Sequence, residues 1–241
     1  MDHAKLERHG VAFAFAILGV ASLGGLFEIA PLFTIENTVE RVQGMRPYTP
    51  LELAGRDIYV REGCYACHSQ MIRTLRSDVE RYGHFSLAAE SMYDHPHQWG
   101  SKRTGPDLAR IGGKYSDDWH VAHLSAPRDT VPGSVMPGYG FLAEARLNTE
   151  TLPQSLAALA RIGVPYTSEQ ITGAARDAVR QADAEAEYED DLWDSYGHTV
   201  QIRDFDGDPD RLTEMDALVA YLQMLGSLVD LENLRLEDLN Q

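Results

Sequence analysis

The residues best suited to chemistry are the five from Cys64 to His68, which read C-x-x-C-H. Two thiols three positions apart can each add to a vinyl group of one haem, and the histidine that follows is then placed to bind the iron. Cys64 and Cys67 are the only cysteines among the 241 residues, so none is left for a structural disulfide. A redox dithiol usually accompanies a βαβ pattern, and a zinc site needs a second ligand pair; the sequence has neither. It therefore predicts one covalently attached haem c.

The second axial ligand of the iron is expected to be Met136, which lies in the segment 132–139, PGSVMPGY. Prolines and glycines on both sides hold this thioether in a rigid, non-helical frame, and a weak Fe–S bond needs such a frame. Compared with ligation by two histidines, ligation by histidine and methionine raises the reduction potential of the haem. It also leaves no open position on the iron, which suits electron transfer. Met71 is too close to His68 in sequence to reach the opposite face of the haem, and Met92 has no rigid loop around it. Met215 and Met224 belong to the expected C-terminal helix, where methionine usually fills the core.

The stretch between the haem motif and Met136 is rich in donors that could meet the haem propionates. These expected donors are Arg73, Arg76, Trp99, Lys102 and Arg103. Farther along, Ser116 is expected to cap a short helix over 117–124. His120 and His123 on that helix are interpreted as ordinary helix residues.

Two helices are expected to frame the haem motif. Thr49 as N-cap, Pro50 at the first helical position and Glu52 three residues after the cap predict a helix to about Arg61. A second capped helix is predicted from Thr213, with apolar residues at helical spacing and Gly226 as its stop. An N-terminal helix that crosses a C-terminal one, with C-x-x-C-H between them, is the arrangement of class I cytochromes c.

The segment 144–211 is predicted to be a helical insertion. Two helices are expected, from Thr151 to Gly163 and from the capping box at Thr167 to about Tyr188. The loop 204–210 carries a carboxylate at every second position, which raises the alternative of a calcium site. It departs from the EF-hand pattern, so a solvated acidic loop is favoured.

The segment from Val11 to Phe33 holds 23 residues with a single charge, Glu28. About 20 apolar residues suffice to cross a bilayer, so an uncleaved transmembrane anchor is predicted. A cleaved signal peptide is the alternative, but its apolar core is usually about 7–15 residues. Lys5 and Arg8 favour a cytoplasmic N-terminus. Because bacteria attach haem c outside the cytoplasmic membrane, the expected location is the bacterial inner membrane with the haem domain in the periplasm.

The net charge of −16 is unevenly distributed along the chain. Residues 1–143 carry 16 acidic and 14 basic side chains, and residues 144–241 carry 21 and 7, which gives −2 and −14. Binding to nucleic acid phosphates needs basic surfaces, so no nucleic acid partner is expected. A basic partner or a solvated acidic face fits the C-terminal part.

Several longer blocks resemble the mono-haem subunit II (CcoO or FixO) family of cbb3-type cytochrome c oxidases. They are residues 56–59, 64–73, 81–83, 93–96, 99–108, 135–137 and 220–223. The resemblance implies haem attachment at Cys64 and Cys67 and iron ligation by His68 and Met136. It also implies that the backbone around Pro106, in a G-P-x-L element, orients the proximal imidazole. A calcium ion shared with the catalytic subunit would lie near Ser101.

The resemblance implies a non-catalytic subunit that relays electrons to a haem–copper catalytic subunit for oxygen reduction coupled to proton translocation. Its expected partners are that subunit, a dihaem cytochrome c subunit or soluble donor cytochrome, and membrane lipid. The alternatives are the cytochrome c subunit of a nitric oxide reductase and a free-standing membrane-anchored shuttle; a peroxidase-like enzyme would need an open iron position.

In outline, the sequence predicts a mainly α protein: a class I cytochrome c domain with a helical insertion, tethered by one N-terminal transmembrane helix. The expected parts are a cytoplasmic N-terminus (1–10), the anchor (11–33), a linker (34–48) and the periplasmic domain (49–241), with the acidic insertion at about 144–211.

Overall fold

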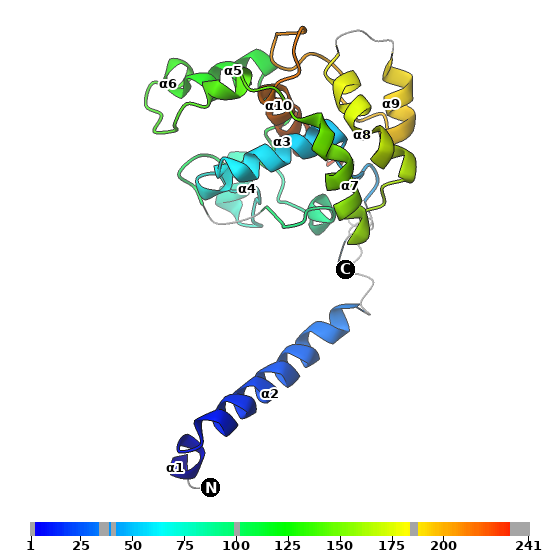
Figure 1. Ribbon diagram of the computed structural model, residues 1–241. Coiled ribbons are helices and arrows are strands. Elements are labelled where there is room, and N and C mark those ends of the chain that lie inside the picture. Colours follow the sequence, from blue (N-terminus) through cyan, green and yellow to red (C-terminus); the bar gives the residue numbers. More distant parts are fainter. Residues whose placement is uncertain (1–2, 34–38, 40–41, 99–101, 184–187, 232–241) are drawn as a thin grey trace.

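The computed structural model describes residues 3–33, 39, 42–98, 102–183 and 188–231. Over these ranges the secondary structure consists of helices and two isolated β-bridges (Figure 1). This confirms the predicted mainly α fold class.

An apolar helix stands apart at the N-terminus. The short α1 (His3–Glu7) leads into α2 (Gly10–Ile29), and a 3₁₀ turn, η1 (Ala30–Phe33), extends it. The span Gly10–Phe33 has 24 residues, and none of them is buried. Figure 1 shows this helix standing apart from the other helices. Its length and composition fit one crossing of a membrane, which agrees with the anchor predicted over 11–33.

The core of the remaining chain is the crossing of α3 (Pro50–Arg61) and α10 (Glu214–Met224), the most extensive helix pair in the structure. Both helices begin with the predicted caps: Thr49 and Thr213 each accept a bond from the backbone N–H three residues later. The approach is close because Gly55 has no side chain, and a Cβ there would collide with the Ala217 carbonyl. Every residue of α10 from Met215 to Met224 is buried, so this helix forms the centre of the fold.

Shorter elements surround this pair. They are η3 (Cys64–Ala66), α4 (Arg76–Tyr82), η4 (Ala88–Ser91), α5 (Asp117–Ser125), α6 (Pro127–Thr130) and η5 (Gly140–Ala143). Ser116 caps α5 as predicted, since its Oγ accepts a bond from the N–H of Trp119.

The insertion contains one helix more than predicted. Its elements are η6 (Thr149–Thr151), α7 (Leu152–Arg161), α8 (Ser168–Gln181) and α9 (Glu189–Tyr196). Asn148, and not Thr151, caps the start, because Thr151 already has helical φ and ψ.

The expectation that α8 continues to about Tyr188 is wrong. Ala174 and Ala178 supply its buried face, whereas residues 182–187 are only alanine and acidic residues. The Gln181 carbonyl accepts from the N–H of Arg203 at 3.0 Å and not from a further helical turn, so α8 ends at Gln181.

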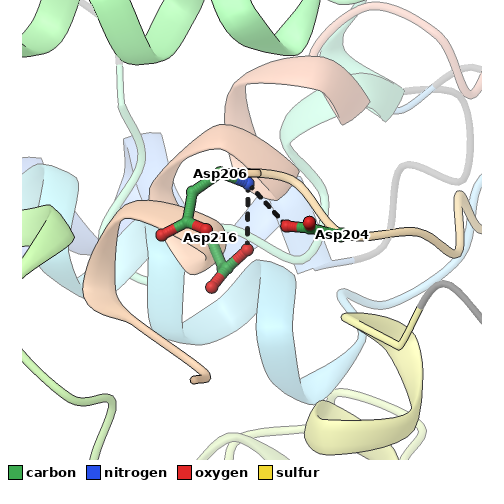
Figure 2. Close-up of side chains that lie close together, drawn as sticks. All are labelled: Asp204, Asp206 and Asp216. Carbon is green, nitrogen blue, oxygen red and sulfur yellow. Dashed lines mark hydrogen bonds between the residues drawn. The ribbon is translucent and has the colours of Figure 1, made fainter. Parts of the chain in front are cut away.

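The acidic loop after α9 uses its carboxylates to hold its own backbone (Figure 2). Asp204 accepts bonds from the N–H groups of Asp206 and Gly207, and Asp216 accepts them from Phe205 and Asp206. Oxygens of Asp204, Asp206 and Asp216 lie within 4.8 Å of one another. Asp216 is buried, and this burial raises the pKa of its carboxyl to about 6. The four aspartates of the loop 204–210 are half-buried or exposed, and the buried carboxylate that holds the loop belongs to Asp216 in the first turn of α10.

Candidate functional site

The C-x-x-C-H motif forms a tight turn directly after α3. Gly63 has φ +72°, a conformation that favours glycine, and it turns the chain into η3. The N–H groups of Cys67 and His68 then donate to the Cys64 carbonyl at 3.1 and 2.9 Å. Both thiols are free; Cys67 is exposed, and burial raises the pKa of the half-buried Cys64 to about 11. The turn presents two thiols and an imidazole to one space.

The His68 ring is fixed by the segment that follows Arg103. Nδ1 of His68 lies 2.8 Å from the carbonyl oxygen of Pro106. Because a carbonyl only accepts, Nδ1 carries the proton and Nε2 keeps a lone pair. Burial lowers the pKa of His68, while the Pro106 carbonyl opposes this change. Gly105 lies against the flat ring, where a Cβ would collide with its atoms.

Asp107 locks this segment in place. Its buried carboxylate accepts bonds from Ser69 Oγ at 2.6 Å, from the Met71 N–H at 3.0 Å and from the Ala109 N–H at 2.8 Å. An ion pair with Arg103 at 3.2 Å adds a fourth partner. On the His68 side of the site, Asp107 thus joins its own segment, 103–109, to residues 69–71, which directly follow His68.

Cys64, Cys67, His68 and Met136 line one cavity of about 520 Å³. Its apolar lining comes from several elements, including Tyr59, Leu108, Ile111, Leu124, Leu218 and Leu222. Binding pockets for small molecules and cofactors are typically about 300–1,000 Å³ and mostly apolar. A haem therefore fits the donor set and the size of this cavity.

The loop that carries Met136 is hydrogen-bonded to α5 and α6. The N–H of Tyr139 donates to the Leu124 carbonyl at 2.6 Å, and Arg128 donates to the Ser134 carbonyl at 3.1 Å. The N–H of Met136 itself meets Ser134 Oγ at 3.2 Å. The loop is therefore held at several points, as its prolines and glycines predicted.

The rival methionines lie elsewhere. Met71 and Met92 are exposed side chains outside the cavity lining, and Met215 and Met224 are core residues of α10. Met136 is the methionine that lines the cavity within the described ranges.

The predicted propionate donors do not line the cavity where the structure describes them. Arg73 and Arg103 both pair with Asp78, Arg76 pairs with Glu80, and Lys102 is exposed. Trp99 and Ser101 lie outside the described residues. The described Arg and Lys side chains in the lining are instead Arg81, Arg110 and Lys114.

Pro106 does line the cavity, as do two histidines that the sequence had given no role. His120 and His123 lie three apart on α5, next to Leu124 of the apolar lining. Burial lowers the pKa of His120 to about 4. Burial also lowers the pKa of His123, and the neighbouring His68 lowers it further. The spacing of His120, His123 and Leu124, which puts them on one helix face, was the available signal.

Comparison with known proteins agrees with this chemistry. A family model described as cytochrome c oxidase, mono-haem subunit/FixO, matches residues 3–229. A comparison with curated proteins gave no match. The family match spans the apolar helix, the C-x-x-C-H turn, the Met136 loop and α10, so the chain belongs to the FixO family of mono-haem cytochrome c oxidase subunits.

Proposed function

We propose that this chain is the membrane-anchored c-type cytochrome subunit of a cbb3-type haem–copper oxidase. The observation that carries the proposal is the state of His68: Nδ1 donates its hydrogen to the Pro106 carbonyl, so Nε2 keeps its lone pair and faces a cavity that two thiols and Met136 also line. Cys64 and Cys67 would attach the haem, and His68 and Met136 would bind its iron. When bound, the haem supplies a one-electron redox centre with both axial positions filled.

Such a centre passes electrons and does not bind oxygen. The subunit would take electrons from a dihaem cytochrome subunit or a soluble cytochrome and pass them to the catalytic haem–copper subunit, where oxygen reduction is coupled to proton translocation. The cytochrome c oxidase description of the family favours this role over a nitric oxide reductase subunit or a free-standing shuttle.

The proposed location is the bacterial inner membrane. Residues 11–33 would cross it once, with residues 1–10 in the cytoplasm and the domain from residue 49 in the periplasm. Glu28 in the apolar helix favours contact with a protein partner, since an unpaired acid in a bilayer is costly.

Expression of the full chain with its oxidase partners and the haem-attachment machinery tests the proposal. Denaturing gels stained for haem should show one haem-bearing band of this subunit's mass, and the stain should be lost in Cys64→Ala/Cys67→Ala. Blue-native gels should place the same haem in an oxidase-active complex. A subunit that takes up no covalent haem, or that always migrates alone, would contradict the proposal.

A further inference from the structure

His123 stands on the same wall of the cavity as Met136. It belongs to α5, and the Met136 loop is bonded to that helix through the Tyr139 N–H and the Leu124 carbonyl at 2.6 Å. Gly138 in this loop lies so close to Ser125 that a Cβ would sit 2.7 Å from the Ser125 carbonyl oxygen. His123 and Met136 therefore share one rigid support, whereas His68 is held by the segment 103–108.

The hydrogen bonds of His123 define its tautomer. Nδ1 lies 2.6 Å from Thr130 Oγ1, and that hydroxyl donates its own hydrogen to the Pro127 carbonyl at 3.1 Å. Thr130 must then accept from His123, so Nδ1 carries the proton and Nε2 keeps a lone pair. This is the state that Pro106 imposes on His68. Two histidines on one cavity are thus prepared in the same way to offer Nε2 to a metal.

The His123 ring is also fixed in orientation. It stacks on Trp119 with ring centroids 4.6 Å apart and an interplanar angle of 11°. Bonded at Nδ1 and stacked on one face, the ring has little freedom to turn. No hydrogen bond from a described residue reaches Nε2, and the side chain lines the cavity. The tautomer and the ring orientation of His123 are therefore both set by its neighbours.

We propose that His123 is a standby ligand of the haem iron, which binds through Nε2 when Met136 is displaced. The proposal rests on the proposed function, since it needs the covalent haem. The Fe–S(Met) bond is weak, and an imidazole held beside it would keep both axial positions filled when the thioether leaves. The redox centre would then stay closed to oxygen and to small ligands while the Met136 loop opens.

Met136→Ala in the full chain, expressed with its partners, exposes the standby ligand. The oxidised haem should remain low-spin by electron paramagnetic resonance and visible absorption, with the signature of two nitrogen ligands. Met136→Ala/His123→Phe should become high-spin, because phenylalanine keeps the ring on Trp119 and removes the nitrogen. Met136→Ala/His120→Phe tests the other histidine of the lining, whose Nε2 is also buried without a hydrogen bond from a described residue, and this variant should stay low-spin.

Three results would overturn the proposal: a high-spin haem in Met136→Ala alone, a low-spin haem in Met136→Ala/His123→Phe, or a high-spin haem in the His120 variant. Failure of the proposed function looks different, because the unmodified chain would then carry no covalent haem at all. A second variant tests the tautomer argument. Met136→Ala/Thr130→Val removes the acceptor at Nδ1, and we expect its low-spin fraction to fall below that of Met136→Ala.

Discussion

Gly55 of α3 faces Tyr221 of α10 so closely that a Cβ at Gly55 would lie 2.7 Å from the Tyr221 Cβ. The two helices meet through backbone at this point, and Tyr59 and Tyr221 pack beside it with ring centroids 5.7 Å apart. The crossing supports the cavity, because Tyr59, Leu218 and Leu222 all belong to its lining.

Gly55→Ala should therefore lower the free energy of unfolding. Overpacking of a core typically costs about 1–3 kcal/mol, and here the obstacle is the backbone of Ala217. Thermal or urea unfolding followed by circular dichroism measures the loss. Gly140→Ala is the control, since its Cβ would meet Ser125 only at an ordinary 3.7 Å. Equal stability of the two variants would contradict the close crossing.

Asp107→Asn should weaken the proximal side of the site. An amide has one acceptor oxygen, so it cannot accept from Ser69, Met71 and Ala109 as the two carboxylate oxygens do, and it also loses the ion pair with Arg103. An unsatisfied buried group costs about 1–3 kcal/mol. Urea unfolding followed by haem absorbance would report the loss, with Asp118→Asn as an exposed control on α5. If the Asp107 variant unfolded at the same urea concentration as the control, the hydrogen bonds of Asp107 would not contribute to the free energy of unfolding.

Met136→Ala should abolish the weak long-wavelength charge-transfer band that accompanies Fe–S(Met) ligation in oxidised c-type cytochromes. The reason is that Met136 is the methionine of the cavity wall among the described residues. Absorption spectra of the oxidised subunit measure the band, and Met92→Ala is the matched control. A band that persists in Met136→Ala would mean that another side chain binds the iron.

Lys102→Glu should leave haem content and spectrum unchanged but reduce oxygen consumption by the assembled oxidase. Lys102 is exposed, and a cation next to the haem motif can steer a partner. Arg103 is unsuitable for this test, because it pairs with Asp78 and Asp107 and its reversal would disturb the fold. Arg76→Glu, at a side chain 89% exposed on α4, serves as control. Oxygen consumption equal to that of the control would argue against docking at Lys102.

The buried Asp216 should make stability depend on pH. Its pKa is about 6 in the folded protein against an ordinary 3.8, so the fold favours the protonated form. The stabilisation is complete below about pH 3.8 and is lost as the pH rises through about 6, at most about 3 kcal/mol.

His120 acts in the opposite direction in the same range, because its pKa is lowered from 6.5 to about 4. The contribution of Asp216 is therefore obtained by difference. Urea unfolding of the unmodified chain and of Asp216→Asn between pH 4 and 7 should diverge, with the unmodified chain losing stability relative to the variant as the pH rises. Parallel curves would show that Asp216 ionises normally in the fold.

The sequence predicts the elements whose ends are set by local chemistry. Thr49, Ser116, Thr167 and Thr213 all cap helices as expected, because the bond from a backbone N–H to a hydroxyl oxygen three residues earlier depends only on neighbouring residues. The early end of α8 was missed because the Gln181 carbonyl bonds to Arg203, a residue 22 positions farther along the chain. The same holds for Asp216, whose carboxylate is buried by the loop that it holds.

The residues of the candidate site also divide into those that local sequence indicates and those that only the fold brings to the cavity. Cys64, Cys67 and His68 form a motif that is readable in the chain, and Met136 stands in an unusual loop. Which cations line the cavity depends on tertiary contacts: Arg81 lies in the lining, whereas Arg103 pairs with Asp78 and Asp107 outside it. His123 acquires its tautomer from Thr130, a partner that only the fold of α5 and α6 brings within reach.

The α3–α10 crossing also sets an order of assembly. Gly55 and Ala217 are 162 positions apart, and closing a loop of that length precedes any contact between the two helices. A growing chain contains Cys64 to His68 long before it contains Leu218 and Leu222, so the C-x-x-C-H motif exists before this part of the cavity wall. α10 is the last helix among the described residues, so it is made after every other described element of the cavity wall.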